Sequence, residues 1–389
     1  MIEVAYKDFS GDFHQTAIQE SEAKRLPLEG MIELTRLCSL KCTHCYIGDS
    51  RWIKSPDELS TAQMKELLDV LAAKGTLWLC FTGGEAMIRK DFRELWLYAK
   101  QKGFILSLFT NATLIDESMA EFLFQNPPLV VEVSIYGATE EIYEAVTLVK
   151  GSYKRFMRGV QNLRKAGLPW KMKTVLIKEN AVEFEAMKRL AVEWEVAFKF
   201  DSNINASIGV GRTGGKAPCA SRVEHEESLR AELADMKNVT DLRDTVAADA
   251  ARSPDAVRVE NLYSCGAGQN TFYINADANL QMCVLTGHRG HDLKKGNSIA
   301  KAFDSGWDQF AEARRVKRLP NSPCGTCDIA TLCENCPGFS HLENGNEQGV
   351  VDYLCRSTHL KAAALGVPHR CDIRHFVYSP LKGTISNGQ

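Results

Sequence analysis

Several features that would assign a protein to a class at first sight are missing from this 389-residue sequence. No apolar run approaches the roughly 18 residues that a membrane-spanning helix needs, so we expect no membrane partner. The first 30 residues lack the basic-then-apolar pattern of a secretory signal, and we expect a cytoplasmic protein. The 47 Lys and Arg against 49 Asp and Glu leave no general basic face, which disfavours a nucleic-acid partner.

Cysteine, by contrast, is abundant, with 13 residues in short clustered spacings. Disulfides are rare in the cytoplasm, so this pattern indicates metal binding. Cys38, Cys42 and Cys45 follow a C-x3-C-x2-C spacing directly after an apolar run. Three thiolates from one loop can hold three irons of a [4Fe–4S] cube and leave the fourth iron open. The alternative is a zinc loop, but zinc loops usually pair C-x2-C steps and close four ligands.

A second motif follows the apolar run from Leu77 to Phe81, which opens into Gly83, Gly84 and Glu85. Glycines let a backbone approach a ligand without a Cβ between them. A carboxylate can accept hydrogen bonds from an ammonium group. Taken alone, this motif also fits an ordinary turn between a strand and a helix.

The cysteine triplet followed by Gly-Gly-Glu resembles the radical S-adenosylmethionine (SAM) enzymes. The resemblance implies that the amino and carboxylate groups of SAM chelate the open iron. It also implies that an electron from the cluster cleaves the sulfonium to give a 5′-deoxyadenosyl radical.

Residues 31–203 alternate short apolar runs with amphipathic helical patterns, which is typical of repeated βα units around a parallel sheet. We expect six strands at Met31–Leu37, Thr76–Thr82, Phe104–Thr110, Leu129–Tyr136, Trp170–Ile177 and Val196–Asp201. A capping box of Ser60 and Gln63 starts the first helix, and Gly75 ends it. Six such units resemble the partial (β/α)6 barrel of the radical SAM core.

The resemblance also implies SAM contacts at the ends of these strands. Asn111 and Ser134 are placed to hydrogen-bond the ribose or carboxylate of SAM, and His44 lies where the family often has an aromatic residue beside the adenine. The alternative for Asn111 is a turn residue. For His44 it is an exposed loop histidine.

The C-terminal region contains a second set of cysteines. Cys265 and Cys283 flank an expected hairpin with strands at 271–275 and 280–282 around a polar turn at 276–279. The remaining members are Cys324, Cys327, Cys333, Cys336 and Cys355. The four at C-x2-C-x5-C-x2-C, taken alone, also fit a zinc ribbon or a single Fe–S site.

The order of all seven resembles the SPASM domain, which binds two auxiliary [4Fe–4S] clusters downstream of many radical SAM cores and so implies three clusters in total. Carried over by position, the more distal cluster has the ligands Cys324, Cys327, Cys333 and Cys355, and the nearer one has Cys265, Cys283 and Cys336. Two residues separate Cys333 from Cys336 where the family usually has three. This difference affects which cysteines are assigned to which of the two auxiliary clusters. Ala278 replaces the usual hairpin glycine.

Three further cysteines have no position in this pattern. Cys80 lies inside an apolar strand and is expected to be a small apolar filler. Cys219 and Cys371 are candidate extra ligands that would close the nearer cluster.

We therefore expect an α/β fold in which a partial (β/α)6 radical SAM barrel precedes a smaller α+β cysteine-rich SPASM domain. The expected divisions are an N-terminal segment at 1–30, a radical SAM core at 31–205, a bridging loop and helix at 206–260, and the SPASM domain and tail at 261–389.

The leading interpretation is a maturase that abstracts hydrogen from a ribosomally made precursor peptide to install a crosslink or related modification. Its implied electron donor is a flavodoxin or ferredoxin. Residues 1–30 are too few for a precursor-recognition domain, so leader recognition would fall to a separate protein or to the SPASM surface. Val284 replaces the aspartate of sulfatase maturases, which disfavours that activity.

Two alternatives remain. One is a radical SAM enzyme acting on a small molecule such as a tetrapyrrole or a sugar. The other is a non-catalytic iron–sulfur electron carrier, against which the intact Gly-Gly-Glu argues.

Overall fold

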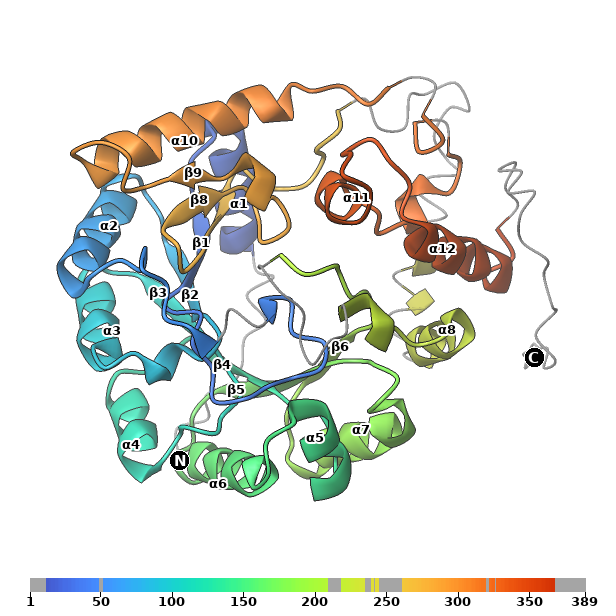
Figure 1. Ribbon diagram of the computed structural model, residues 1–389, viewed down its shortest axis with the longest axis horizontal. Helices are drawn as coiled ribbons and strands as arrows, with labels where there is room; N and C mark the ends of the chain where they lie inside the picture. The colour runs from blue at the N-terminus through green and yellow to red at the C-terminus, as the bar shows by residue number, and fades with distance from the viewer. Residues whose placement is uncertain are drawn as a thin grey trace.

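The computed structural model describes residues 12–48, 52–208, 218–234, 239–240, 242–244, 261–319, 322–325 and 327–367. Its centre is a parallel sheet in which each strand pairs with the next one along the chain. The strands are β1 Glu29–Glu33, β2 Trp78–Thr82, β3 Ile105–Thr110, β4 Val130–Ser134, β5 Trp170–Val175 and β6 Phe198–Asp201. The expected α/β partial barrel is confirmed (Figure 1).

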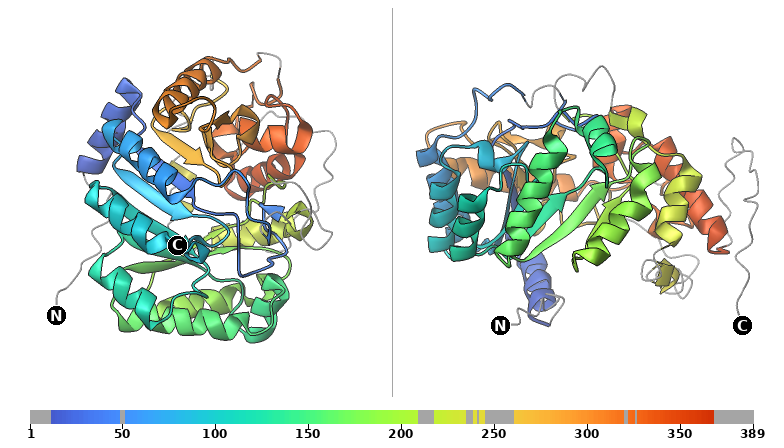
Figure 2. Two further views of the ribbon diagram at one scale, coloured as in Figure 1. Left: turned by 60° about the vertical axis from the view of Figure 1, so that its left-hand side comes forward. Right: turned by 90° about the horizontal axis from the view of Figure 1, so that it is seen from below.

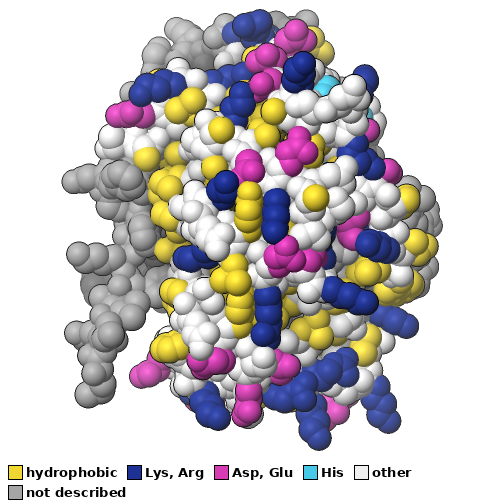
Figure 3. Space-filling model, turned by 90° about the vertical axis from the view of Figure 1, so that its left-hand side faces the viewer, with side chains coloured by type: hydrophobic (Ala, Val, Ile, Leu, Met, Phe, Trp, Pro, Cys, Tyr) yellow, Lys and Arg dark blue, Asp and Glu magenta, His cyan; other side chains and the backbone are white. Residues whose placement is uncertain are grey.

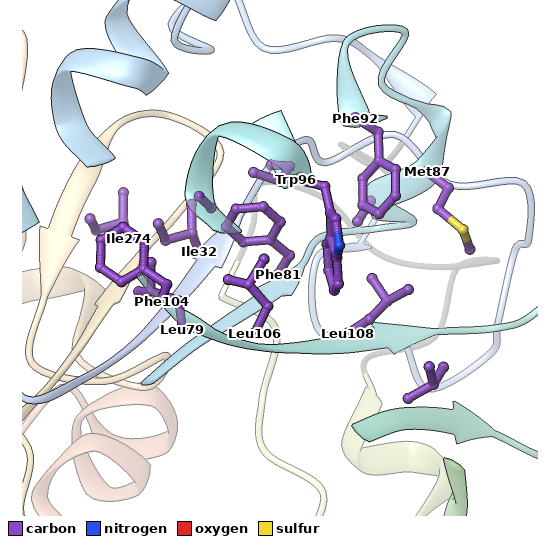
Figure 4. Close-up of a cluster of buried hydrophobic side chains, with 14 of the residues drawn as sticks. Ile32, Leu79, Phe81, Met87, Phe92, Trp96, Phe104, Leu106, Leu108 and Ile274 are labelled. Atoms are coloured by element: carbon purple, nitrogen blue, oxygen red, sulfur yellow. The ribbon is translucent and has the colours of Figure 1, made fainter. Parts of the chain in front are cut away.

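Helices between the strands cover the outer face of this sheet (Figures 1 and 2). They are α2 Thr61–Ala73, α3 Phe92–Gln101, α4 Glu117–Gln125, α5 Glu140–Thr147, α6 Ser152–Lys165 and α7 Phe184–Glu193. The Ser60–Gln63 capping box is present at the start of α2, as expected from the sequence. Alternate strand residues such as Leu79, Phe81 and Leu106 pack under these helices in one hydrophobic core (Figure 4).

The expected boundaries of the first strand are wrong. It begins at Glu29, two residues before Met31, and it leaves the sheet after Glu33 rather than after Leu37. Beyond Glu33 the chain turns into the cysteine loop, and the backbone carbonyls of Thr35 and Leu37 accept hydrogen bonds from the Gly-Gly-Glu segment. The apolar run continues to Leu37, so the sequence alone does not show where the first strand stops pairing with its neighbours.

The C-terminal part continues the same sheet. Strand β7 (Thr271–Ile274) pairs in parallel with β1, and β8 (Asn279–Gln281) and β9 (His291–Asp292) extend it in antiparallel fashion. The sheet order is β6-β5-β4-β3-β2-β1-β7-β8-β9, and the left view of Figure 2 shows the hairpin beside β1. Cys283 therefore follows closely after an extension of the core sheet.

The described part of the chain contains further helices. They are α1 Asp12–Lys24, α8 His225–Leu233, α10 Ile299–Arg314, α11 Pro337–Asn344 and α12 Asp352–Ala364, with short 3₁₀ segments at Ala86–Ile88, Ala181–Glu183, Pro218–Ser221, Gly287–Arg289 and Ala330–Leu332. No helix in the described ranges is long and apolar enough to cross a membrane. On the side that faces the viewer in Figure 3, cationic and anionic side chains are interspersed.

Candidate active site

The cysteine loop is fastened to its neighbours through backbone groups. The N–H groups of Lys41 and Thr43 donate to the carbonyls of Thr147 (2.9 Å) and Val146 (3.0 Å) at the end of α5. The hydroxyls of Ser39 and Thr113 lie 2.9 Å apart. These contacts fix Cys38, which is half-buried, and Cys42, which is buried, near the ends of the strands.

The two glycines of the second motif allow the cysteine loop itself to approach. A Cβ on Gly84 would lie 2.4 Å from the carbonyl oxygen of Arg36 and 2.5 Å from that of Leu37. A Cβ on Gly83 would lie 2.4 Å from the carbonyl oxygen of Thr35. The sequence reasoning assigned this space to a bound ligand, whereas the structure fills it with the chain that leads into Cys38.

Glu85 directs its carboxylate into the protein. Its side chain is buried and accepts hydrogen bonds from the Thr110 hydroxyl (2.8 Å), the Asn111 N–H (2.9 Å) and the Met87 N–H (3.4 Å). Burial raises the pKa of this carboxyl from 4.5 to about 7, and the same hydrogen bonds oppose the shift. A carboxylate has about four lone-pair positions, so about one remains for the ammonium of a ligand.

Asn111 connects Glu85 to the cysteine loop. Its side-chain amide donates to Cys38 Sγ at 3.7 Å and to Ser39 Oγ at 3.4 Å. The N–H of Leu40 also donates to Cys38 Sγ, at 3.4 Å. Two donors on one sulfur stabilise a thiolate, the form that binds metal. The structure therefore places Asn111 against a candidate iron ligand. Its side-chain oxygen also accepts a hydrogen bond from the Thr113 N–H at 3.0 Å, so the alternative of a turn residue is present as well.

Aromatic rings line the other side of the loop. The His44 ring lies 5.3 Å from that of Tyr136, centroid to centroid, and Ser134 is within hydrogen-bonding reach of the Tyr136 hydroxyl. Tyr143 is fully buried beside them, and among the described residues its hydroxyl has no hydrogen-bond partner. Burial raises the pKa of the Tyr143 hydroxyl, and the nearby Cys42 and Cys38 thiols raise it further.

The N-terminal donor set consists of thiols, and Cys38 already accepts two hydrogen bonds that stabilise a thiolate. Such a set fits an iron–sulfur cube, which takes one thiolate at each of three corners. Among the residues that the structure describes, no group of three or more His, Cys, Asp or Glu side chains that could hold a single metal ion is found.

The structure brings together the three cysteines assigned to the nearer cluster. Burial raises the pKa of the Cys283 thiol to about 11, and the neighbouring Cys336 and Cys265 thiols raise it further. Cys336 caps the start of α11 and accepts a hydrogen bond from the Phe339 N–H at 3.5 Å. These three thiols, which come from separate segments, are therefore near enough to influence one another electrostatically, and Cys333 of the distal set also acts on Cys336.

The distal set has a feature that the sequence reasoning missed. Asn335 donates through its N–H to Cys333 Sγ (3.4 Å) and through its side-chain amide to Cys324 Sγ (3.6 Å). Asn335 is one of the two residues in the unusually short step before Cys336. Cys327 packs against the segment that α12 covers, and Cys355 lies on α12 itself.

The two candidate extra ligands fare differently. Cys219 is half-buried in a 3₁₀ segment, and burial raises the pKa of its thiol. The charged groups beside it are Arg222 and Glu343, so its surroundings are those of an ion pair. Cys371 lies outside the described residues.

Polar contacts attach the hairpin turn to the end of β1. The buried Glu33 carboxylate accepts a hydrogen bond from the Ala276 N–H at 3.1 Å, and Arg36 pairs with Asp277. Ala278 adopts a left-handed φ of 59°, the conformation that glycine favours. The turn therefore keeps a glycine-like conformation although the glycine is missing.

A cavity of about 330 Å³ opens on the inner face of the sheet, where the core meets the hairpin. Met31, Cys80, Ser107, Tyr273 and Cys283 are among the residues that line it. Cys80 was expected to be an apolar filler in the core. Instead it shares this cavity with Cys283, and burial raises the pKa of its thiol to about 12.

Charged residues occupy the inner face farther along the sheet. The Glu132 carboxylate lies 2.7 Å from Lys171 Nζ and 3.5 Å from Lys173 Nζ. Lys173 also places its ammonium 3.0 Å from the centroid of the Phe109 ring. Burial lowers the pKa of Lys173 to about 8, while Glu132 opposes the shift. Two ammonium groups around one carboxylate leave a net positive charge there.

A partial barrel whose first strand leads into a cysteine loop is typical of the SAM-dependent radical enzymes. Residues 32–191 match the family model described as the radical SAM superfamily. Residues 32–191 are therefore a radical SAM domain, and the expected resemblance of the chain to radical SAM enzymes with a SPASM domain is confirmed. The family implies a [4Fe–4S] cluster and SAM.

The relatives include enzymes named for different products. An Fe-coproporphyrin III synthase of Methanosarcina barkeri is 36% identical over 163 residues, 42% of this chain and 40% of that protein. An AdoMet-dependent heme synthase of Nitratidesulfovibrio vulgaris is 26% identical over 81% of this chain and 88% of its own. The mycofactocin maturase MftC of Mycolicibacterium smegmatis is 27% identical over 77% and 75%.

Among solved structures, Streptococcus suis SuiB has a similar fold. Its TM-score is 0.64 at 17% identity, covering 88% of this chain and 81% of SuiB.

Proposed function

We propose that this enzyme cleaves SAM reductively at a cluster held by Cys38, Cys42 and Cys45. We further propose that the resulting radical abstracts hydrogen from a ribosomally made peptide. Two auxiliary clusters would be held by Cys324, Cys327, Cys333 and Cys355 and by Cys265, Cys283 and Cys336. The cluster beside the strand ends would supply the electron that breaks the sulfonium bond.

The residues around the cysteine loop have distinct roles in this proposal. Asn111 and the Leu40 N–H stabilise the Cys38 thiolate by donating to its sulfur. Gly83 and Gly84 allow the cysteine loop to lie against the Glu85 segment. The Glu85 carboxylate can accept about one further hydrogen bond. His44 and Ser134 lie around Tyr136 and would contact the adenine and the ribose or carboxylate of SAM.

The observation that carries the peptide substrate is the size and position of the inner cavity. Its volume of about 330 Å³ is near the lower end of the range for drug-sized ligands, about 300–1,000 Å³. Such a space suits one inserted side chain of a peptide whose remainder lies outside. Cys283 on its wall would put a proposed auxiliary cluster beside that side chain. The maturase MftC supports this reading as a relative over most of the chain.

A tetrapyrrole substrate is the second candidate. The net positive charge of Lys171 and Lys173 beside Glu132 would suit a carboxylate side chain of a porphyrin. The relatives named as heme and Fe-coproporphyrin III synthases favour the same class.

One experiment separates the two candidates. The reduced enzyme is incubated with SAM and either a short peptide encoded beside its gene or a carboxylate-bearing iron porphyrin, and the products are weighed by mass spectrometry. A changed peptide mass with an unchanged porphyrin supports our proposal. A porphyrin that loses mass while the peptide stays intact would replace it with the second candidate.

A variant that fills the cavity tests whether the cavity is the substrate site. Ser107→Phe would fill the cavity without touching the cysteine loop. We expect SAM cleavage without substrate to persist, whereas peptide modification falls at least tenfold. Unchanged peptide modification by this variant would show that the cavity is not the substrate site.

A further inference from the structure

A second cavity, of about 490 Å³, lies between α1 and the C-terminal end of α10. Arg25, Arg314 and Arg315 line it together with Glu22 and Cys265. It shares no lining residue with the cavity on the inner face of the sheet. Three guanidinium groups against one carboxylate give it a positive character.

Two of the arginines in this cavity donate to backbone carbonyls rather than to carboxylates. Arg25 donates to the backbone carbonyls of Gly268 and Trp307, and Arg314 donates to that of Ala267 at 2.9 Å. Within the described part of the chain, Arg25, Arg314 and Arg315 take part in no ion pair. Burial lowers the pKa of the Arg25 guanidinium, and Arg314 and Arg315 reinforce that effect while Asp308 opposes it. The cavity therefore favours an anionic partner.

Cys265 gives this cavity a connection to the proposed clusters. Among the described cysteines it is the exposed one, whereas its neighbours Cys283 and Cys336 are half-buried. The proposed nearer cluster would therefore approach the surface at Cys265, in the wall of the positive cavity. A partner docked there would bring its own redox centre close to that cluster.

We infer that the Arg25–Arg314–Arg315 surface beside Cys265 is the docking site for an acidic, one-electron carrier protein that reduces the enzyme. The carrier would lose one electron, and a [4Fe–4S] cluster would pass from the 2+ to the 1+ state. Charge complementarity would accelerate encounter and set the orientation. The inference rests on the proposed nearer cluster but not on the identity of the substrate.

A matched pair of variants on one helix tests the inference. Arg315→Glu reverses a charge at the docking surface, and Lys301→Glu makes the same change at the other end of α10, about 20 Å away at 1.5 Å per residue. Both side chains are exposed. Iron content and reduction by dithionite, a small reductant, show that each variant is folded and loaded.

The readouts need neither SAM nor substrate. Reduced flavodoxin is mixed with each reconstituted protein in a stopped-flow instrument, and bleaching of the clusters is followed as a function of ionic strength. Oxidised flavodoxin is titrated separately to obtain its dissociation constant. We expect Arg315→Glu to slow reduction by flavodoxin about tenfold, to weaken flavodoxin binding and to flatten the salt dependence, with dithionite reduction unchanged. Lys301→Glu should match the parent.

Two results would overturn the inference. One is equal slowing by both variants, which would indicate a general charge effect. The other is unchanged reduction by flavodoxin and unchanged flavodoxin binding in Arg315→Glu, which would show that the carrier docks elsewhere. Failure of the proposed clusters is distinguishable, because it appears as low iron content rather than in the flavodoxin titration.

Discussion

At the scale of single residues, the site depends on how closely two backbone segments approach. Gly84 lies so near the Arg36 and Leu37 carbonyls that no Cβ fits between them. Its φ is outside the left-handed region, so the requirement for glycine at this position is steric.

We expect Gly84→Ala to displace the cysteine loop and to lower both stability and iron content. Gly103→Ala is the matched control, because Gly103 has a φ of 90° and no atom within 4 Å of a built Cβ. The control should cost only about 1–2 kcal/mol of backbone strain and keep full iron. Denaturation and iron analysis of both variants provide the measurement. Equal iron in the two variants would contradict the steric account.

Glu85 gives a prediction about pH. Its carboxyl has a pKa of about 7 in the folded chain against 4.5 otherwise, so the folded state holds a proton that the unfolded state has released between these values. The free energy of unfolding of the cluster-free protein should therefore fall as pH rises from about 4.5 to 7. Glu85→Gln should reduce this fall by about 1–3 kcal/mol, at about 1.4 kcal/mol per pKa unit. Urea unfolding at pH 5 and pH 8 measures the difference, and an unchanged difference would refute the prediction.

Part of this residue-level picture was predictable from the sequence and part was not. The cysteine spacings and the Ser60–Gln63 cap are local patterns; the structure confirms the cap, and the assignment of Cys265, Cys283 and Cys336 to one cluster stays a prediction. The donors on Cys38 and Cys324 come from Asn111 and Asn335, which lie 73 and 11 residues away. No local pattern marks such contacts.

At the scale of elements, the junction between the core and the C-terminal hairpin is a parallel strand pair. Gly30 of β1 lies directly against the Phe272 ring of β7. On the outer face Phe272 packs edge-on against Phe303 and Trp307 of α10, with ring centroids 5.8 and 6.5 Å away. This ring joins the sheet extension to its covering helix.

Phe272→Ala should therefore destabilise the chain by about 3–5 kcal/mol, the usual cost of removing a buried phenylalanine. Because β1 and β7 share one sheet, we expect unfolding of the core and of the hairpin to remain a single transition. Circular dichroism and tryptophan fluorescence can be compared during denaturation. Two separate transitions, with the two signals changing at different denaturant concentrations, would show that the two parts fold independently.

The elements themselves followed from the sequence more readily than their pairing did. Continuous apolar runs and capped helices identified all six core strands, since both features are local. The pairing of β1 with β7 joins residues about 240 positions apart, and β9 has two residues. Neither has a periodic signal, so both became visible only in the structure.

At the scale of the whole molecule, the proposal implies three clusters in one continuous architecture. Protein reconstituted without oxygen should therefore hold about 12 irons, four for each cube. Iron and zinc analysis measures this directly. Iron near four per chain accompanied by bound zinc would contradict the auxiliary clusters and leave the N-terminal one standing.

The central claim is that Cys38, Cys42 and Cys45 hold the cluster that cleaves SAM. It is tested most directly by measuring 5′-deoxyadenosine formed from SAM under strong reductant, in the parent and in the variant with all three cysteines replaced by Ala. We predict steady formation by the parent and none by the variant, which should keep about eight irons at its C-terminal sites. Formation of 5′-deoxyadenosine by the variant at the parent rate would contradict the account.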